Sequence, residues 1–78
     1  MLFRSFNDKL TQGQDAYKRA NYQGALDHFL NAQVEKPQDS KLNYNIGNTY
    51  YKMANYTKAL GYYKESLKPD TRDRKSVV

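Results

Sequence analysis

The sequence predicts an all-α fold built from tandem antiparallel helical hairpins. Two observations lead to this prediction: the chain repeats itself at an offset of 34 residues, and apolar residues recur at helical spacing within each copy. The alternation of period two that a half-buried strand requires never persists along the chain. We therefore expect four helices, near residues 6–19, 22–35, 40–53 and 56–68.

The repeat places identical or similar residues on one another across the two copies. The identical pairs are Gly13 and Gly47, Tyr17-Lys18 and Tyr51-Lys52, Ala20-Asn21-Tyr22 and Ala54-Asn55-Tyr56, and Ala25-Leu26 and Ala59-Leu60. Between them Phe29 falls on Tyr63 and Ala32 on Ser66, so aromatic meets aromatic and small meets small. Small residues at fixed points allow two helices to approach closely, which accounts for Gly13 and Gly47 without any ligand.

Apolar spacing defines the helices within each copy. Residues Tyr22, Ala25, Leu26 and Phe29 follow the i, i+3, i+4, i+7 rule and predict the second helix of the first copy. The equivalent stripe of the second copy consists of Tyr56, Ala59, Leu60, Tyr63 and Leu67, and Ile46, Gly47, Tyr50 and Ala54 mark the helix before it. Aromatic residues dominate the buried area of small helical units, so Phe29, Tyr50 and Tyr63 are predicted core residues.

Helix ends are predicted from capping residues and proline. Asn21 and Asn55 stand where a short polar side chain can cap the second helix of each copy, and Asp39 or Ser40 can cap the third helix. Pro37 lies between the copies and ends the second helix, because its ring cannot continue the backbone hydrogen bonding.

This pattern resembles the tetratricopeptide repeat family. The signature positions are filled by Gly13, Ala16, Ala25, Phe29, Ala32 and Pro37 in the first copy and by Gly47, Tyr50, Ala59, Tyr63 and Ser66 in the second. Departures from the motif are Lys9 and Gln12, where large apolar residues are usual, and a displaced Pro69. The resemblance implies one domain over residues 1–78, with repeats at 6–39 and 40–71 and with 72–78 as a flexible basic tail or the start of a third repeat.

The resemblance also implies that function lies on the concave face formed by the first helix of each pair. Its partner-binding residues would be Asn7, Thr11, Gln14, Tyr17 and Lys18, with Leu10 among them, and Lys41, Tyr44, Asn45, Asn48, Tyr51 and Lys52. Amides can pair with a peptide backbone as donor and acceptor, tyrosine offers a flat apolar face with a polar tip, and lysine prefers carboxylates. We expect a non-catalytic scaffold or adaptor that binds another protein or peptide.

Two alternatives stay open. Only two repeats are present, whereas such arrays usually need about three, so the last helix is expected to expose a face through which the chain can form a homo-oligomer. The net charge of +5 and eight tyrosines suit a basic nucleic-acid-binding helical module, which is the less favoured alternative because no RNA-binding motif accompanies them.

Catalysis and cofactors are not expected. No nucleophile, acid, base or metal ligands converge in the pattern, and the single histidine, His28, lies in a helix with no second ligand at metal-binding spacing. With no cysteine, disulfides and thiolate sites are excluded. No apolar run is long enough for a membrane span, so the sequence predicts a soluble chain and favours the cytoplasm.

Overall fold

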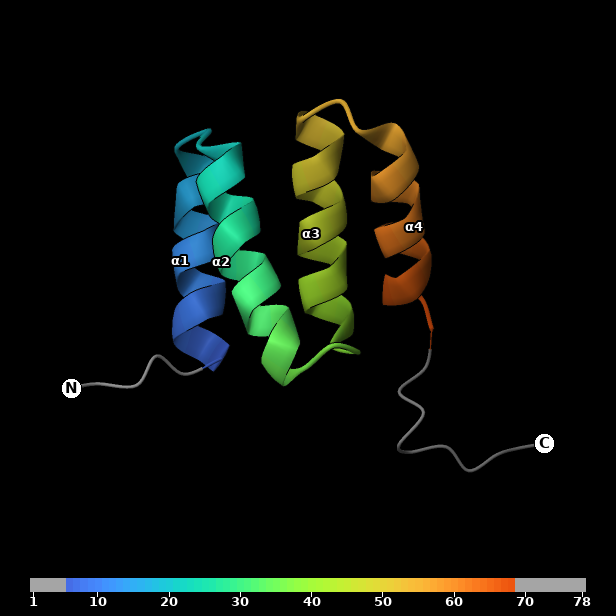
Figure 1. The fold of residues 1–78 in the computed structure, drawn as a ribbon, viewed down its shortest axis with the longest axis horizontal. Coiled ribbons are helices and arrows are strands. Elements are labelled where there is room, and N and C mark those ends of the chain that lie inside the picture. Colours follow the sequence, from blue (N-terminus) through green and yellow to red (C-terminus); the bar gives the residue numbers. More distant parts are fainter. Residues whose placement is uncertain (1–5, 69–78) are drawn as a thin grey trace.

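Four helices account for most of residues 6–68, the part of the chain that the computed structural model describes. They are α1 (Phe6–Lys18), α2 (Tyr22–Glu35), α3 (Ser40–Lys52) and α4 (Tyr56–Ser66), and this part of the chain contains no strand. The helices stand side by side in chain order (Figure 1). The predicted all-α class is confirmed, and each helix ends within two residues of the predicted position. The expected tail at 72–78 and Pro69 lie outside the described residues.

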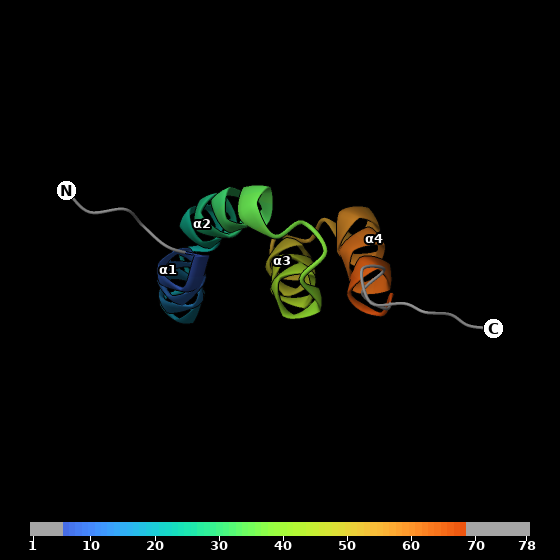
Figure 2. The same cartoon turned by 90° about the horizontal axis from the view of Figure 1, so that it is seen from below.

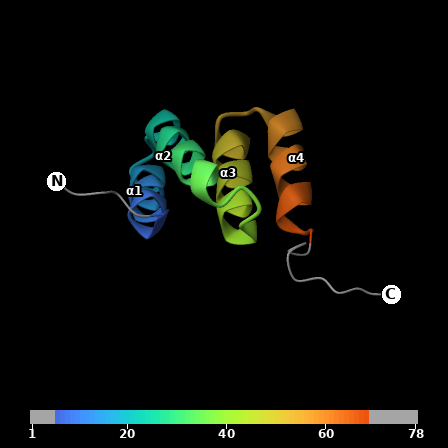
Figure 3. The same cartoon turned by 60° about the horizontal axis from the view of Figure 1, so that its bottom comes forward.

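The helices form two antiparallel pairs, α1 with α2 and α3 with α4, which are joined by packing of α2 against α3. Seen along the helices, α2 lies to one side of both α1 and α3 (Figure 2), and the tilted view shows the second pair beside the first (Figure 3). Consequently α1 and α3 flank the same side of α2. Residues 6–68 contain no helix with both the length and the apolar character that a membrane span needs.

The turns within the two pairs are built in the same way. The backbone N–H of Asn21 donates to the carbonyl of Ala16, and the N–H of Ala20 donates to Tyr17, which is the hydrogen-bond pattern of a Schellman motif. This motif requires the left-handed conformation, and Ala20 adopts it at φ 64°. The side chain of Asn21 then accepts a hydrogen bond from the N–H of Gly24 at 3.1 Å and caps α2. One asparagine therefore ends α1 and begins α2.

The second pair repeats this turn, with Asn55 bonded back to Tyr50, Ala54 at φ 64°, and the Asn55 side chain accepting from Lys58 N at 3.4 Å. The α3 helix begins differently, because the side chain of Asp39 accepts from Leu42 N at 2.8 Å. Both predicted asparagine caps are confirmed, and the predicted choice between Asp39 and Ser40 is resolved in favour of Asp39.

The core runs through the middle of the stack, from α1 to α3. Phe29, Leu42 and Ile46 are its largest fully buried apolar side chains. Gly13 lies against Phe29 and Gly47 against Tyr63, so closely that a Cβ atom at either glycine would stand within 3 Å of the ring. The prediction that these glycines serve close helix packing is confirmed.

Hydrogen bonds of one buried asparagine connect the two helix pairs inside this core. Asn43 is 1% exposed; its amide donates to the carbonyl of Pro37 at 3.1 Å, and its Oδ1 accepts from Gln33 at 3.2 Å. A buried amide that makes these bonds avoids the desolvation cost of an unpaired group. The bonds also fix the position of α3 on α2, because a shifted helix would break them.

Candidate functional site

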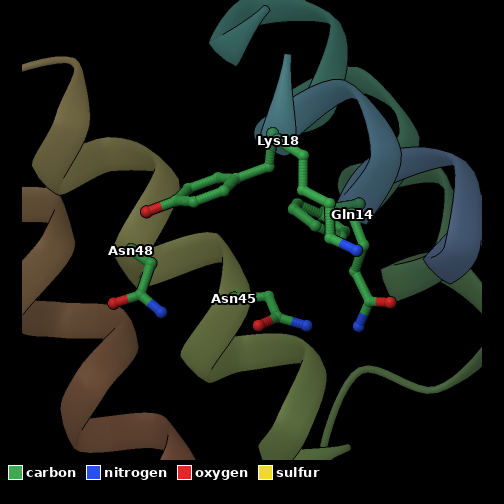
Figure 4. Close-up of a pocket in the computed structure, with 6 residues that line it drawn as sticks. Gln14, Lys18, Asn45 and Asn48 are labelled. Carbon is green, nitrogen blue, oxygen red and sulfur yellow. The ribbon is translucent and has the colours of Figure 1, made fainter. Parts of the chain in front are cut away.

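A hollow of about 170 Å³ opens between α1 and α3, over the side of α2 that both helices flank. It is lined by Gln14, Tyr17, Lys18, Phe29, Asn45 and Asn48. Gln14 and Lys18 extend from α1, and Asn45 and Asn48 face them from α3 (Figure 4). The site therefore has two polar walls, each on a different helix pair.

Helical spacing explains why these side chains meet. Residues four apart, such as Gln14 and Lys18, and three apart, such as Asn45 and Asn48, lie on one face of a helix. The relative placement of α1 and α3 on α2 turns these two faces toward one another, and the amide ends of Gln14 and Asn45 point toward each other in Figure 4.

The floor of the hollow is Phe29 of α2, which is 1% exposed. The absence of a side chain at Gly13 allows the Phe29 ring to sit against α1, since a Cβ there would be 2.4 Å from its Cε1 atom. The hollow therefore combines an apolar floor with amide and ammonium groups at its rim, a combination typical of small ligand-binding sites.

Asn45 is the one described residue with a buried side-chain polar atom that lacks a hydrogen-bond partner within the protein. The atom is Nδ2, a donor, and Asn45 forms part of the wall of the hollow. An unpaired buried donor costs about 1–3 kcal/mol. A ligand oxygen placed in the hollow could accept this hydrogen bond and recover that free energy.

Asn48, in contrast, is held by α4. The hydroxyl of Tyr63 donates to Asn48 Oδ1 at 2.6 Å. This bond holds the Asn48 amide in one orientation, in which its Oδ1 atom already accepts a hydrogen bond. Burial raises the pKa of the Tyr63 phenol above its ordinary value, and the neighbouring phenols of Tyr44, Tyr17 and Tyr51 add to the rise. Tyr63 therefore stays a neutral hydrogen-bond donor well above neutral pH.

Tyrosine rings of α1 and α3 pack against tyrosine rings of α2 and α4. Tyr17 packs edge-on against Tyr22 with ring centroids 5.3 Å apart, and Tyr51 packs against Tyr56 at the same distance. Tyr44 lies 5.7 Å from Tyr63. Such pairs stabilise one ring orientation, so these phenol groups are positioned by the fold rather than free to rotate.

The structure brings together five of the eleven predicted partner-binding residues in the hollow: Gln14, Tyr17, Lys18, Asn45 and Asn48. The other six are exposed and lie outside it: Asn7, Thr11, Lys41, Tyr44, Tyr51 and Lys52. Leu10, named with them in the sequence analysis, is partly buried and packs against the core. An apolar side chain at that position gains more from burial against the core than from exposure.

Sequence reasoning missed two contributors, Phe29 and Tyr63, because it assigned both only to the core. Each does fill space beside a glycine, but Phe29 also floors the hollow and Tyr63 also holds Asn48. Phe29 and Tyr63 occupy equivalent positions in the two repeats, and this equivalence could have indicated that both lie next to the predicted partner-binding amides.

A second, wider hollow of about 550 Å³ lies on the α1–α2 pair, and its lining is polar: Lys9, Gln12, Asp15, Ala16, Arg19, Asn21, His28 and Asn31. Asp15 pairs with Arg19 at 2.7 Å, and Lys9 pairs with Glu35. His28 is partly exposed there, as predicted. Among residues 6–68, no three His, Cys, Asp or Glu residues gather in a way that could hold a metal ion.

No known protein-family model matches this sequence, and a search of curated proteins finds no match either.

Proposed function

We propose that the chain is a tetratricopeptide-type protein-interaction module without catalytic activity, which binds an extended peptide segment of a partner through the face formed by α1 and α3. The observation that carries this proposal is the buried Nδ2 atom of Asn45, which has no partner in the protein and stands in the wall of a hollow. In a helix that serves only as a scaffold, an unpaired buried donor lowers stability without benefit. In a binding site, a ligand can accept the hydrogen bond of that donor.

The chemistry of the hollow defines what the peptide would present. A peptide carbonyl or carboxylate oxygen would accept from Asn45 Nδ2, and an apolar side chain of the peptide would rest on the Phe29 ring. Gln14 supplies both a donor and an acceptor from the opposite wall.

The charges around the hollow favour acidic peptides. Lys18 lines it, Lys41 and Lys52 are exposed on the same predicted face, and no acidic side chain lines it. A carboxylate in the peptide would therefore be attracted to this face, and the attraction would weaken with added salt because exposed charges are screened.

The experiment is a screen of the chain against a library of random short peptides, followed by calorimetric titration of the strongest binder with Asn45 variants. Asn45→Leu removes the donor while nearly preserving side-chain volume. We expect it to weaken binding about tenfold, the factor that corresponds to one lost hydrogen bond of about 1.4 kcal/mol. It should at the same time raise the free energy of unfolding, because it removes an unpaired buried group.

A matched control is Asn31→Leu, which changes an exposed asparagine on α2 outside the hollow. It should leave peptide affinity unchanged. If Asn45→Leu lowers stability and leaves affinity unchanged, Asn45 is a structural residue and the proposal is wrong. A fluorescent single-stranded oligonucleotide serves as the second probe, and tight binding that falls steeply with salt would favour the nucleic-acid alternative instead.

A further inference from the structure

Two tyrosines of α3 expose their rings on the face proposed to bind a peptide. Tyr44 is 54% exposed and Tyr51 is 56% exposed. The ring of Tyr44 is supported by Tyr63 of α4, with centroids 5.7 Å apart. The ring of Tyr51 is supported by Tyr56 of α4, with centroids 5.3 Å apart. Because these contacts already restrict the rings, a ligand that covers them loses less free energy to side-chain ordering.

The spacing of Tyr44 and Tyr51 restricts the conformation of the ligand. They are seven residues apart, so they share one face of α3 and are separated by about 10.5 Å along its axis. In a polyproline II helix, residues three apart point to the same side and are separated by about 9.3 Å. In a β-strand, residues three apart point to opposite sides, and residues two or four apart are separated by about 6.6 or 13.2 Å. Since the hollow lies between α1 and α3, a chain that follows it runs along α3, and the polyproline II conformation fits the two rings better than a strand.

The amides on the same wall present hydrogen-bond donors. Asn48 lies between Tyr44 and Tyr51 on this face of α3, and its Oδ1 atom already accepts from the Tyr63 hydroxyl. Its other polar atom is the donor Nδ2, which is turned toward Asn45 in Figure 4, while the oxygen is turned away. The Nδ2 atom of Asn45 is the unpaired buried donor. A complementary segment must offer carbonyl oxygens, and proline offers a carbonyl without an N–H group.

These donors also distinguish a polyproline II segment from a helical ligand. An α-helix presents the same side every seven residues, but its carbonyls are engaged in hydrogen bonds within the helix. The carbonyls of a polyproline II helix are free, because this helix has no internal hydrogen bonds. We propose that the partner segment is a proline-rich peptide in the polyproline II conformation, with prolines three residues apart on Tyr44 and Tyr51 and a carbonyl between them accepting from Asn48 Nδ2. This inference rests on the proposed function, since it names the class of peptide that the same face binds.

The length of the binding face also suits a rigid ligand. α1 and α3 have 13 residues each, so the face is about 20 Å long. A polyproline II segment of about six residues spans that length. So few contacts have to offset the entropy lost on binding, and a preformed polyproline II helix loses less of it than a flexible peptide does.

A proline-spacing series tests the proposal on the unmodified chain. Fluorescent nine-residue peptides of glycine and serine carry two prolines that stand two, three or four residues apart, and a peptide of nine prolines completes the series. By fluorescence anisotropy, the spacing of three should bind about tenfold more tightly than the other two spacings, and nonaproline should bind at least as tightly. Equal affinities for the three spacings, or no binding of nonaproline, would overturn the proposal.

Protein variants test the donor and the rings separately. Asn48→Asp replaces the donor Nδ2 by an acceptor and keeps an oxygen for Tyr63, so it should weaken nonaproline binding about tenfold. The matched control Asn31→Asp makes the same change at an exposed asparagine outside the hollow and should leave the affinity unchanged. Tyr44→Ala should weaken binding, while Tyr44→Phe should retain it because the ring makes the contact. Equal binding by Asn48→Asp and Asn31→Asp would refute the donor assignment.

The outcomes also separate this inference from the proposed function. If the strongest peptide of the random library contains no proline and Asn45→Leu still weakens its binding, the proline assignment is wrong and the proposed function stands. If no peptide binds at all, both are wrong. An oligothymidine that binds more tightly than nonaproline would assign the tyrosine rings to base stacking and would overturn the proposal.

Discussion

Replacement of Gly13 by alanine tests the packing argument most directly. The added Cβ would lie 2.4 Å from Phe29 Cε1 and 2.5 Å from Cδ1, whereas ordinary contacts begin near 3.4 Å. The ring must therefore move by about 1 Å within a core where it is almost fully buried. Overpacking of this kind costs about 1–3 kcal/mol, while alanine in place of glycine inside a helix gains about 1 kcal/mol.

Gly61→Ala separates these two effects. A Cβ at Gly61 of α4 would meet no atom within 4 Å, so this variant gains the helical preference of alanine alone. The difference in free energy of unfolding between Gly61→Ala and Gly13→Ala then isolates the overpacking cost, and we expect about 1–3 kcal/mol in favour of Gly61→Ala. Urea denaturation followed by circular dichroism measures both variants. If Gly13→Ala is as stable as Gly61→Ala, the close approach of Phe29 to α1 does not exist.

Three further predictions concern the turns and the buried phenol. Ala20→Gly should stabilise the fold by about 0.5–1 kcal/mol. A left-handed alanine costs about 1–2 kcal/mol, and the larger conformational entropy that glycine loses on folding cancels part of the gain from removing that cost. Thermal melting measures the change, and destabilisation would contradict the left-handed turn. Asn55→Ala removes the N-terminal cap of α4 and should lower the free energy of unfolding, measured by urea denaturation, by about 1 kcal/mol. The control Asn31→Ala, which changes an exposed asparagine, should leave the free energy of unfolding nearly unchanged. The raised pKa of Tyr63 means that its stabilising contribution is complete below the ordinary tyrosine pKa of about 10 and is lost as pH rises through the folded value. Tyr63→Phe should therefore show a shallower loss of stability above about pH 10 than wild type, and identical alkaline profiles would contradict this assignment.

The helices and their caps could be predicted from the sequence because the signals for them are local. The stripe from Tyr22 to Phe29 and the caps Asn21 and Asn55 depend only on residues within one or two turns of the chain. The left-handed conformation of Ala20 could not be predicted, because alanine has no preference for it. Packing of α1 on α2 imposes that turn, and packing is a property of the whole pair.

The candidate site could be predicted only in part, for the same physical reason. The positions of Gln14, Asn45 and Asn48 within the repeats predicted that they share one face. They did not predict that Asn48 bonds to Tyr63, or that the Nδ2 atom of Asn45 has no partner in the protein. Hydrogen-bond satisfaction depends on distances between helices of different pairs, and a sequence offset contains no such distances. Similarly, burial of Asn43 follows from its bonds to Pro37 and Gln33 rather than from its polarity.

Positions that agree between the two repeats and positions that differ carry different information. The shared residues, such as Gly13 with Gly47 and Asn21 with Asn55, form the packing contacts and turns that each pair needs.

The residues that differ follow the unequal surroundings of the pairs. Ile46 is buried against α2, whereas its equivalent Gln12 lies at the polar edge of the stack. Lys64 likewise stands, exposed, where the first repeat has the partly buried Leu30, in keeping with the position of α4 at the edge of the stack (Figure 1).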